Sequence, residues 1–165
     1  MKRFNKGRLA LGITGFFLAA GAALGLYPQY LLNIKDISNN KIVWTAAVKP
    51  GDNIWVVFIN SVEHLPVADH FVVNEKHQIM FTETIYQAPY AGYLHPEREE
   101  VIAPGTIRIA GFDKLMAEVT FFAGYDSKHL LFVNGMWVPL YHVARGGGSH
   151  PDRRQQTLTF NLFLG

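Results

Sequence analysis

The chain has 165 residues, no cysteine and a formal net charge of +2. Without cysteine it has no thiolate ligand for an iron–sulfur cluster or a zinc ion, and no cysteine nucleophile. Setting aside the four cations of residues 1–8 leaves 11 basic against 13 acidic residues. Nucleic-acid surfaces are basic, so this balance argues against nucleic acid as a partner.

Residues 9–27 form an uncharged apolar run that predicts a transmembrane helix. A helix of this length is roughly 28 Å long, which matches the hydrocarbon thickness of a bilayer. Lys2, Arg3, Lys6 and Arg8 precede the run, and a basic flank of this kind places the N-terminus in the cytoplasm. We therefore interpret residues 9–27 as a signal anchor that crosses the membrane once, with the remaining chain extracytoplasmic.

The alternative for residues 9–27 is a cleaved secretory signal, for which the alanines between positions 19 and 23 offer a cleavage site. The apolar character continues to Tyr27, which favours an uncleaved anchor. Gly21 and Gly25 form a GxxxG pair, a pattern that lets a second membrane helix approach closely. These two glycines are the predicted helix-packing residues.

Residues 28–41 are predicted to be a linker, and residues 42–165 one extracytoplasmic β-domain. Short segments rich in β-branched and aromatic residues recur in this domain, with turn residues between them. We expect an all-β fold, an antiparallel sandwich or small barrel of about eight short strands. No segment of helical period is evident after residue 42, and the pattern leaves the choice between sandwich and barrel open.

The sharpest local signal is Asn134-Gly135 between two apolar arms, which predicts a type I′ hairpin with Val133 paired to Met136. Pro139 lies in the second arm and indicates an edge strand. Ile54–Ile59 is apolar on both faces, which predicts a central strand covered on both sides.

Glu83 is the acidic residue with the most informative position. Strict alternation along Ile79–Ile85 puts Glu83 on the same face as Ile79, Phe81 and Ile85, which is the presumed inward face. A carboxylate there is costly unless it is paired or hydrogen-bonded. Two roles stay open: a structural tie, to Arg108 or to a backbone amide, or a recognition group.

Other candidate residues lie in predicted loops. Glu63 opens a loop after a buried strand, where binding groups are common. The segment Tyr86–Tyr93 holds three tyrosines with Pro and Gly, a composition that fits an interface or a cap on the end of the sandwich. His64 and His70 have acidic neighbours, but their spacing matches no zinc signature. We predict no metal site, no cofactor and no enzymatic activity.

Two segments, FINSVEHLPVADHF and TETIYQAPYAGYLHP, resemble a bacterial family of domains of unknown function encoded beside TAXI-type TRAP transporters. Ser61 and Glu63 match the family's SVE segment, Glu83 matches its ET segment, and Ala91-Gly92 matches the AG of its loop. The resemblance covers about residues 42–145. It implies a β-domain that is anchored in the bacterial inner membrane, lies on the extracytoplasmic, or periplasmic, side and accompanies such an ion-coupled importer.

The resemblance leads to a functional prediction: a non-enzymatic accessory subunit that assists assembly or gating of solute uptake. Its expected partners are the transporter's membrane subunit and membrane lipid, with the substrate-binding protein as a further candidate. The alternative is a stand-alone anchored domain that binds a small anionic ligand or a metal, using Glu63, Glu83 and His64 or His70. The predicted partner-binding residues are Asn60, Ser61, Glu63, Glu83, Tyr90, Ala91, Gly92 and Tyr93.

Overall fold

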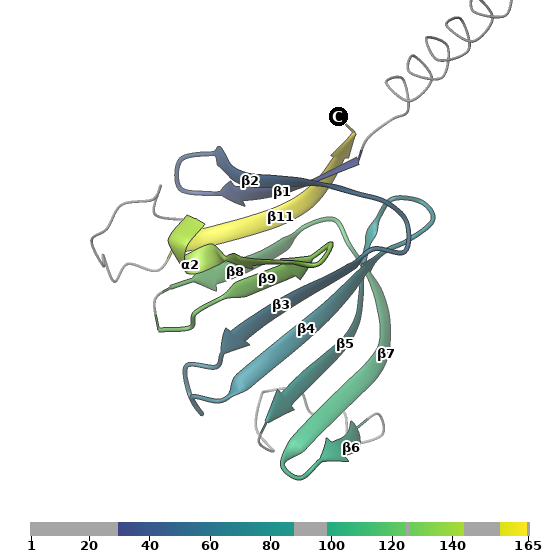
Figure 1. Ribbon diagram of the computed structural model, residues 1–165, viewed down its shortest axis with the longest axis vertical. Helices are drawn as coiled ribbons and strands as arrows, with labels where there is room; N and C mark the ends of the chain where they lie inside the picture. Colours follow the sequence, from purple (N-terminus) through teal and green to yellow (C-terminus); the bar gives the residue numbers. More distant parts are fainter. Residues whose placement is uncertain (1–29, 88–98, 125, 144–155, 165) are drawn as a thin grey trace, which may run out of the picture.

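Two antiparallel sheets make up the described part of the chain, so the predicted all-β class is confirmed (Figure 1). The computed structural model describes residues 30–87, 99–124, 126–143 and 156–164. The predicted membrane helix with its two glycines and the segment Tyr90–Tyr93 lie outside these residues. Within the described ranges, no helix has the length and apolar character needed to cross a bilayer.

The smaller sheet has four strands in the order β2-β1-β11-β8, so β2 and β8 are its edges. Neighbouring strands are antiparallel throughout this sheet. Its strands are β1 (Tyr30–Asp36), β2 (Lys41–Val48), β8 (Val119–Ala123) and β11 (Gln156–Leu164).

The larger sheet has seven strands in the order β10-β9-β3-β4-β5-β7-β6, also antiparallel. Its strands are β3 (Asn53–Ile59), β4 (Pro66–Val73), β5 (Ile79–Gln87), β6 (Glu99–Ala103), β7 (Thr106–Met116), β9 (Leu130–Val133) and β10 (Met136–Pro139). The described residues therefore form eleven strands where the sequence suggested about eight. No described ladder joins the two sheets, which is the arrangement of a sandwich.

The core lies between the two sheets. Leu32 and Phe160 come from the four-stranded sheet and Ile54 and Leu131 from the seven-stranded sheet, and all four side chains are fully buried. Phe160 meets Phe71 of β4 edge to face, with 5.4 Å between the ring centroids. Alternating residues of both sheets thus face one another, as expected for strands with one apolar face.

Strand β1 corrects the prediction of a linker over residues 28–41. Tyr30–Asp36 pairs with β2 on one side and with β11 on the other. Leu32 and Ile34 point into the core, and both are fully buried. Only the turn that follows β1 is irregular, and there the Asp36 carboxylate accepts hydrogen bonds from Ser38 and Asn39. The folded domain therefore includes residues before position 42, because a central strand comes from there.

The predicted hairpin at Asn134-Gly135 is confirmed. Both residues have positive φ, 51° and 77°, and Val133 pairs with Met136. β10 is an edge strand, as Pro139 indicated. The absence of helix after position 42 is corrected in one place: Pro139 ends the ladder, and a single helical turn, α2 (Leu140–Val143), follows it.

Candidate functional site

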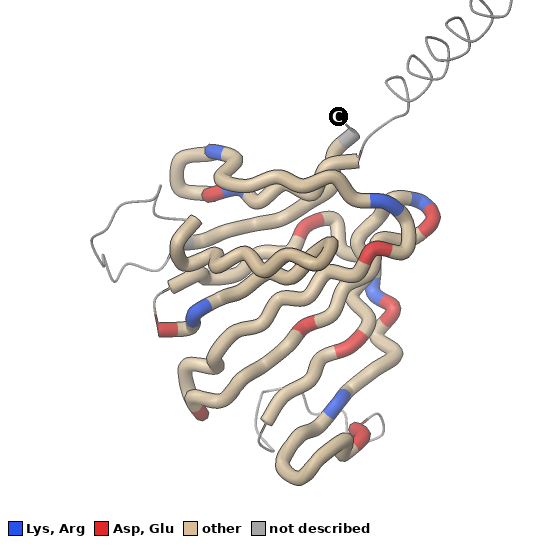
Figure 2. Tube along the Cα trace, viewed as in Figure 1, with Lys and Arg blue, Asp and Glu red and all other residues tan. Residues whose placement is uncertain are grey.

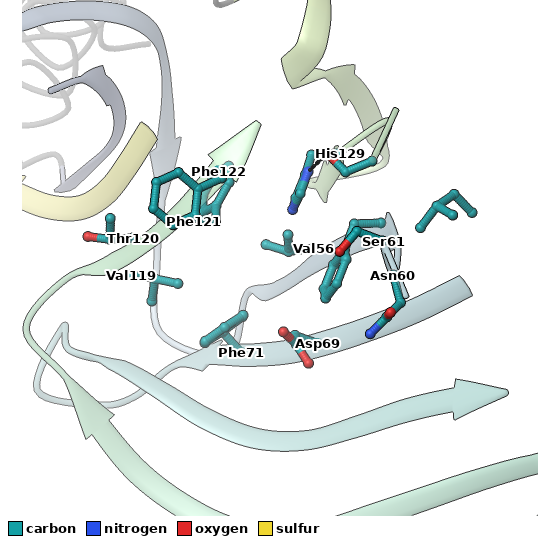
Figure 3. Close-up of a pocket in the computed structure, with 13 residues that line it drawn as sticks. Val56, Asn60, Ser61, Asp69, Phe71, Val119, Thr120, Phe121, Phe122 and His129 are labelled. Atoms are coloured by element: carbon teal, nitrogen blue, oxygen red, sulfur yellow. Dashed lines mark hydrogen bonds between the residues drawn. The ribbon is translucent and has the colours of Figure 1, made fainter. Parts of the chain in front are cut away.

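A pocket of about 430 Å³ opens between the sheets beside the edge strand β8 (Figure 3). One wall comes from β3 and β4 of the larger sheet and the other from β8 of the smaller sheet. Ser61, Thr120 and Phe122 are exposed and form the rim. Val56 and Phe71 are buried and form part of the floor. The pocket lies where the two sheets no longer cover each other.

Asp69 is the only acid among the described residues that line the pocket. It shares a face with Val67 and Phe71, because β4 alternates regularly through this stretch. Its Oδ1 atom is buried and has no hydrogen-bond partner in the described chain. The facing hydroxyl of Thr84, across the ladder, is near enough to favour the charged carboxylate weakly, but it does not meet the geometry of a hydrogen bond to Oδ1. The carboxylate is thus held near the core with one oxygen unsatisfied.

Burial sets the charge state of Asp69. Desolvation raises the pKa of this carboxyl from 3.8 to about 6, and the nearby Thr84 hydroxyl lowers it only in part. At pH 7 the group is therefore mostly ionised, although its burial disfavours the charge. Figure 2 shows that most charged residues lie in turns and at strand ends, whereas Asp69 lies within a strand.

His129 faces the same space from the opposite side, as Figure 3 shows. Its ring is stacked between Phe58 of β3 and Phe121 of β8, with centroid distances of 4.9 and 5.3 Å. Its Nδ1 atom lies 2.9 Å from the Ser127 hydroxyl. Desolvation lowers the pKa of His129 to about 4, so the ring is neutral at pH 7. Three stacked rings therefore connect the two sheets beside the pocket.

Three predicted partner-binding residues lie in the loop between β3 and β4. Ser61 and Glu63 are exposed in this loop, and Ser61 belongs to the pocket rim. Asn60 has a structural role, since its side-chain oxygen accepts hydrogen bonds from the backbone of Val62 and Glu63, at 2.8 and 3.2 Å. His64 in the same loop has a φ of 54° and is exposed.

Glu83 lies on the outward face of the larger sheet, which corrects the prediction of an inward face. Glu83 pairs with His70 and Phe81 pairs with Phe71, so Thr82 is an extra residue in β5. This β-bulge reverses the alternation, and Thr84 points inward instead of Glu83. The Thr82 hydroxyl contacts both the His70 carbonyl and the His70 ring, which holds the bulge in place.

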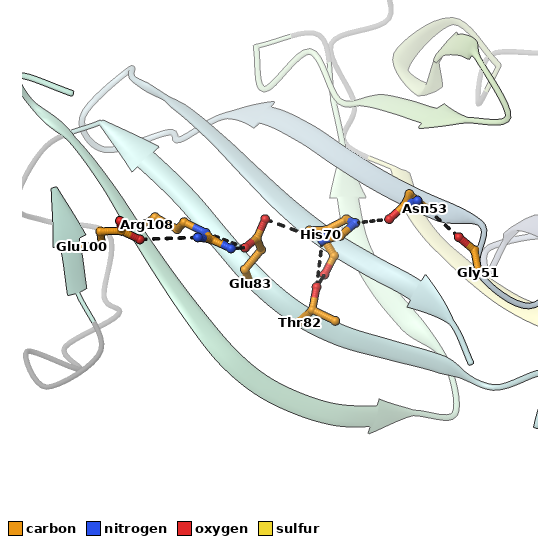
Figure 4. Close-up of polar contacts among 7 residues, drawn as sticks. All are labelled: Gly51, Asn53, His70, Thr82, Glu83, Glu100 and Arg108. Carbon is orange, nitrogen blue, oxygen red and sulfur yellow. Dashed lines mark hydrogen bonds and ion pairs between the residues drawn. The ribbon is translucent and has the colours of Figure 1, made fainter. Parts of the chain in front are cut away.

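Polar side chains form a row across the outward face (Figure 4). Arg108 of β7 donates through Nε to Glu83 at 2.6 Å, and its Nη2 forms an ion pair with the same carboxylate oxygen. Its Nη1 reaches Glu100 at 3.4 Å. His70 lies 2.9 Å from Asn53 through Nε2 and 2.9 Å from Thr82 through Nδ1. The structural tie to Arg108, one of the two roles left open for Glu83, is therefore present.

The Glu83→Gln variant is expected to melt several degrees below the parent chain, because Arg108 loses its charged partner inside the row. Glu83 has only 13% of its side chain exposed. The matched control is Glu100→Gln, since that side chain is 64% exposed and exposed ion pairs contribute little. Thermal unfolding followed by circular dichroism measures both variants. Equal melting temperatures for the two variants would contradict a structural role for Glu83.

The structure joins only two of the residues predicted for the alternative ligand site: His70 and Glu83 pair across the ladder, with 3.7 Å between Nδ1 and Oε1. Both ring nitrogens of His70 already have partners, and His64 lies in the loop before β4. Among the described residues, no group of three or more His, Asp or Glu side chains is placed to hold a metal ion. Glu63 and Glu83 lie on different parts of the domain, one in a loop and one in the middle of β5.

The pocket residues Asp69 and His129 were missed by the sequence reasoning. The signal for Asp69 was present: it has the same parity as Val67, Phe71 and Val73, all buried. No comparable signal exists for His129, because it lies in the turn before β9.

Comparison with known proteins adds no candidate, since no family model, curated protein or solved structure matches the chain.

Proposed function

We propose that the chain is a membrane-anchored, non-enzymatic accessory subunit of a TAXI-type TRAP transporter, assisting assembly or gating of solute uptake. The apolar run of residues 9–27 with its basic flank supports the anchor at the inner membrane. The resemblance of the segments around Ser61–Glu63 and Glu83–Gly92 supports the association with the transporter. The β-domain then lies on the extracytoplasmic side.

The observation that carries the proposal is the position of the two resembling segments in the sheet. Ile59 pairs with Pro66, so the loop of residues 60–65 is at the end of the sheet where β4 begins. Val67 pairs with Tyr86, so β5 ends, at Gln87, at that same end. The loop with Ser61 and Glu63 therefore lies beside the point from which the chain continues toward Tyr90–Tyr93. We name this end of the larger sheet, formed by residues 60–65 and Gln87, the motif end.

The anchor joins the domain away from the motif end. Residues 9–27 lead into β1, and its first residue, Tyr30, stacks on His77 with 3.6 Å between the ring centroids. His77 lies in the turn that follows β4, whereas the motif end precedes β4. The eight residues of β4 span ~26 Å. This separation favours two distinct contacts: the anchor binds the membrane subunit, and the motif end binds the substrate-binding protein.

Co-purification of the full chain with the transporter's membrane subunit and substrate-binding protein, from a mild detergent, tests the proposal. The Glu63→Arg variant is expected to lose most of the substrate-binding protein, because it reverses an exposed charge at the motif end. Glu75→Arg is the matched control, since Glu75 is exposed in the turn at the other end of β4.

Replacing Gly21 and Gly25 by leucine is expected to weaken the contact with the membrane subunit.

The proposal fails if the parent chain brings down neither transporter component. The assignment of the motif end fails if Glu63→Arg and Glu75→Arg retain equal amounts of the substrate-binding protein. Circular dichroism of each variant checks that the domain is still folded.

A further inference from the structure

We infer that the pocket between β4 and β8 is a binding site for a small organic ammonium ion. The cationic group would pair with the Asp69 carboxylate, and the hydrocarbon part would lie against Phe58, Phe71 and Phe121. The pocket shares Asn60 and Ser61 with the motif end, but binding of a small ammonium ion does not require the partner-binding role proposed above.

The charge of the pocket selects a cation. Asp69 is the one charged side chain among the described lining residues, and the His129 ring is neutral at pH 7. The buried Oδ1 of Asp69 has no hydrogen-bond partner, so a donor that enters the pocket would satisfy an otherwise costly group. An anionic ligand would be repelled by the same carboxylate. The structure thus favours the opposite charge to the anionic ligand considered from the sequence.

The walls of the pocket select an organic cation over a metal ion. A calcium or magnesium ion requires several oxygen ligands and favours carboxylates, whereas this pocket offers one carboxylate, with neutral hydroxyl and amide groups and aromatic rings around it. No group of three or more His, Asp or Glu side chains in the described ranges is placed to hold a metal ion. Aromatic faces attract ammonium groups, and the effect grows when the cation is removed from water. Phe71 is buried, and Phe58 and Phe121 flank His129 on either side. The volume of about 430 Å³ is within the range of sites for small molecules.

A set of three probes with the same ring tests the inference on the full chain in detergent. Benzylammonium, benzyl alcohol and benzoate share a phenyl ring and carry a positive, a neutral and a negative polar group, respectively. Two-dimensional NMR titration at pH 7.5 reports where each one binds. We expect benzylammonium to shift signals of the pocket residues and to bind at least tenfold more tightly than the other two probes. Equal affinity for the alcohol, or no shift at the pocket with benzylammonium, would overturn the inference.

The Asp69→Asn variant keeps the shape of the side chain and removes its charge. Its affinity for benzylammonium is expected to fall at least tenfold. Asp126→Asn is the control, because Asp126 is exposed in the turn just before Ser127 and does not line the pocket. For the parent chain, lowering the pH from 7.5 to 5 should weaken binding ~tenfold as Asp69 takes up a proton. Unchanged binding by Asp69→Asn would refute the role of the carboxylate.

The ammonium group could belong to a free amine or to a lysine of a bound protein. Co-purification of Asp69→Asn with the transporter components separates the two sources. Loss of the substrate-binding protein assigns the cation to that protein, and its retention assigns the cation to a free amine. The probe titration is measured without any transporter component, so its outcome is independent of the co-purification result.

Discussion

The Asp69→Asn variant is expected to be more stable than the parent chain at pH 7.5, by ~3 kcal/mol. Asp69 is ionised at this pH although its Oδ1 is buried without a partner. A rise in pKa from 3.8 to about 6 means that the folded state holds the charged form less favourably than the unfolded chain does. Asparagine removes that cost. When the removal of a charged residue makes a protein more stable, that residue is expected to serve binding and not folding.

The raised pKa of Asp69 also determines whether the fold becomes more or less stable as the pH rises. The cost of the Asp69 charge is absent below pH 3.8 and complete above about pH 6, so this group makes the fold less stable as pH rises. His129 acts in the opposite direction. Its pKa is lowered from 6.5 to about 4, so its contribution is complete above pH 6.5 and lost as pH falls through about 4. Between pH 6.5 and pH 4 the two groups therefore oppose each other.

Separating the two groups by mutation makes the prediction measurable. As the pH falls from 6.5 to 4, Asp69→Asn should lose ~3 kcal/mol of unfolding free energy through His129, because the opposing effect of Asp69 is gone. His129→Phe should gain stability through Asp69 over the same range, because the opposing effect of His129 is gone. His70, whose pKa is also lowered, contributes equally to the parent and both variants. Urea unfolding at several pH values measures the slopes, and parallel slopes for the two variants would contradict the assignment.

The Phe160→Ala variant is expected to lose ~3–5 kcal/mol of stability and to melt roughly 10 °C lower. Phe160 is fully buried in β11, and its ring meets Phe71 and Phe121 at centroid distances of 5.4 and 6.2 Å. Removal of the ring leaves a cavity between the two sheets, because the neighbouring side chains belong to hydrogen-bonded strands and cannot move far enough to fill it.

Phe163→Ala is the matched control for the core variant. It removes the same side chain from the same strand, but Phe163 is 49% exposed. Its melting temperature should change by only a few degrees, because about half of the residue already remains in water in the folded state. Thermal unfolding of both variants under one buffer condition makes the comparison. Similar losses for the two variants would show that β11 is not packed as described.

Local patterns in the sequence account for the parts of the fold that depend on a few neighbouring residues. Asn134-Gly135 adopts positive φ at both positions almost without cost, so the hairpin and its register could be predicted. Pro139 lacks an N–H, so an edge position for its strand followed. The tie between Glu83 and Arg108 was one of two roles considered, since a largely covered carboxylate needs a partner.

Other features depend on contacts that no local pattern contains. The face of Glu83 was predicted wrongly because one extra residue, Thr82, shifts every later side chain to the other side. Tyr30–Asp36 was interpreted as a linker, although it is a central strand because β11 pairs along its other edge. The bulge and this pairing are stabilised by residues distant in the chain, so the periodicity around them gives no sign of either.

The amino-acid sequence alone was sufficient for the all-β class and for the expectation of an N-terminal anchor, because alternation, turn residues and an uncharged apolar run are local properties. The pocket required the three-dimensional arrangement. Asp69 and Phe121 are far apart in the chain and line one space only because β8 joins the opposite sheet. The pKa of Asp69 has the same origin, since desolvation depends on what covers a group and not on its neighbours in sequence.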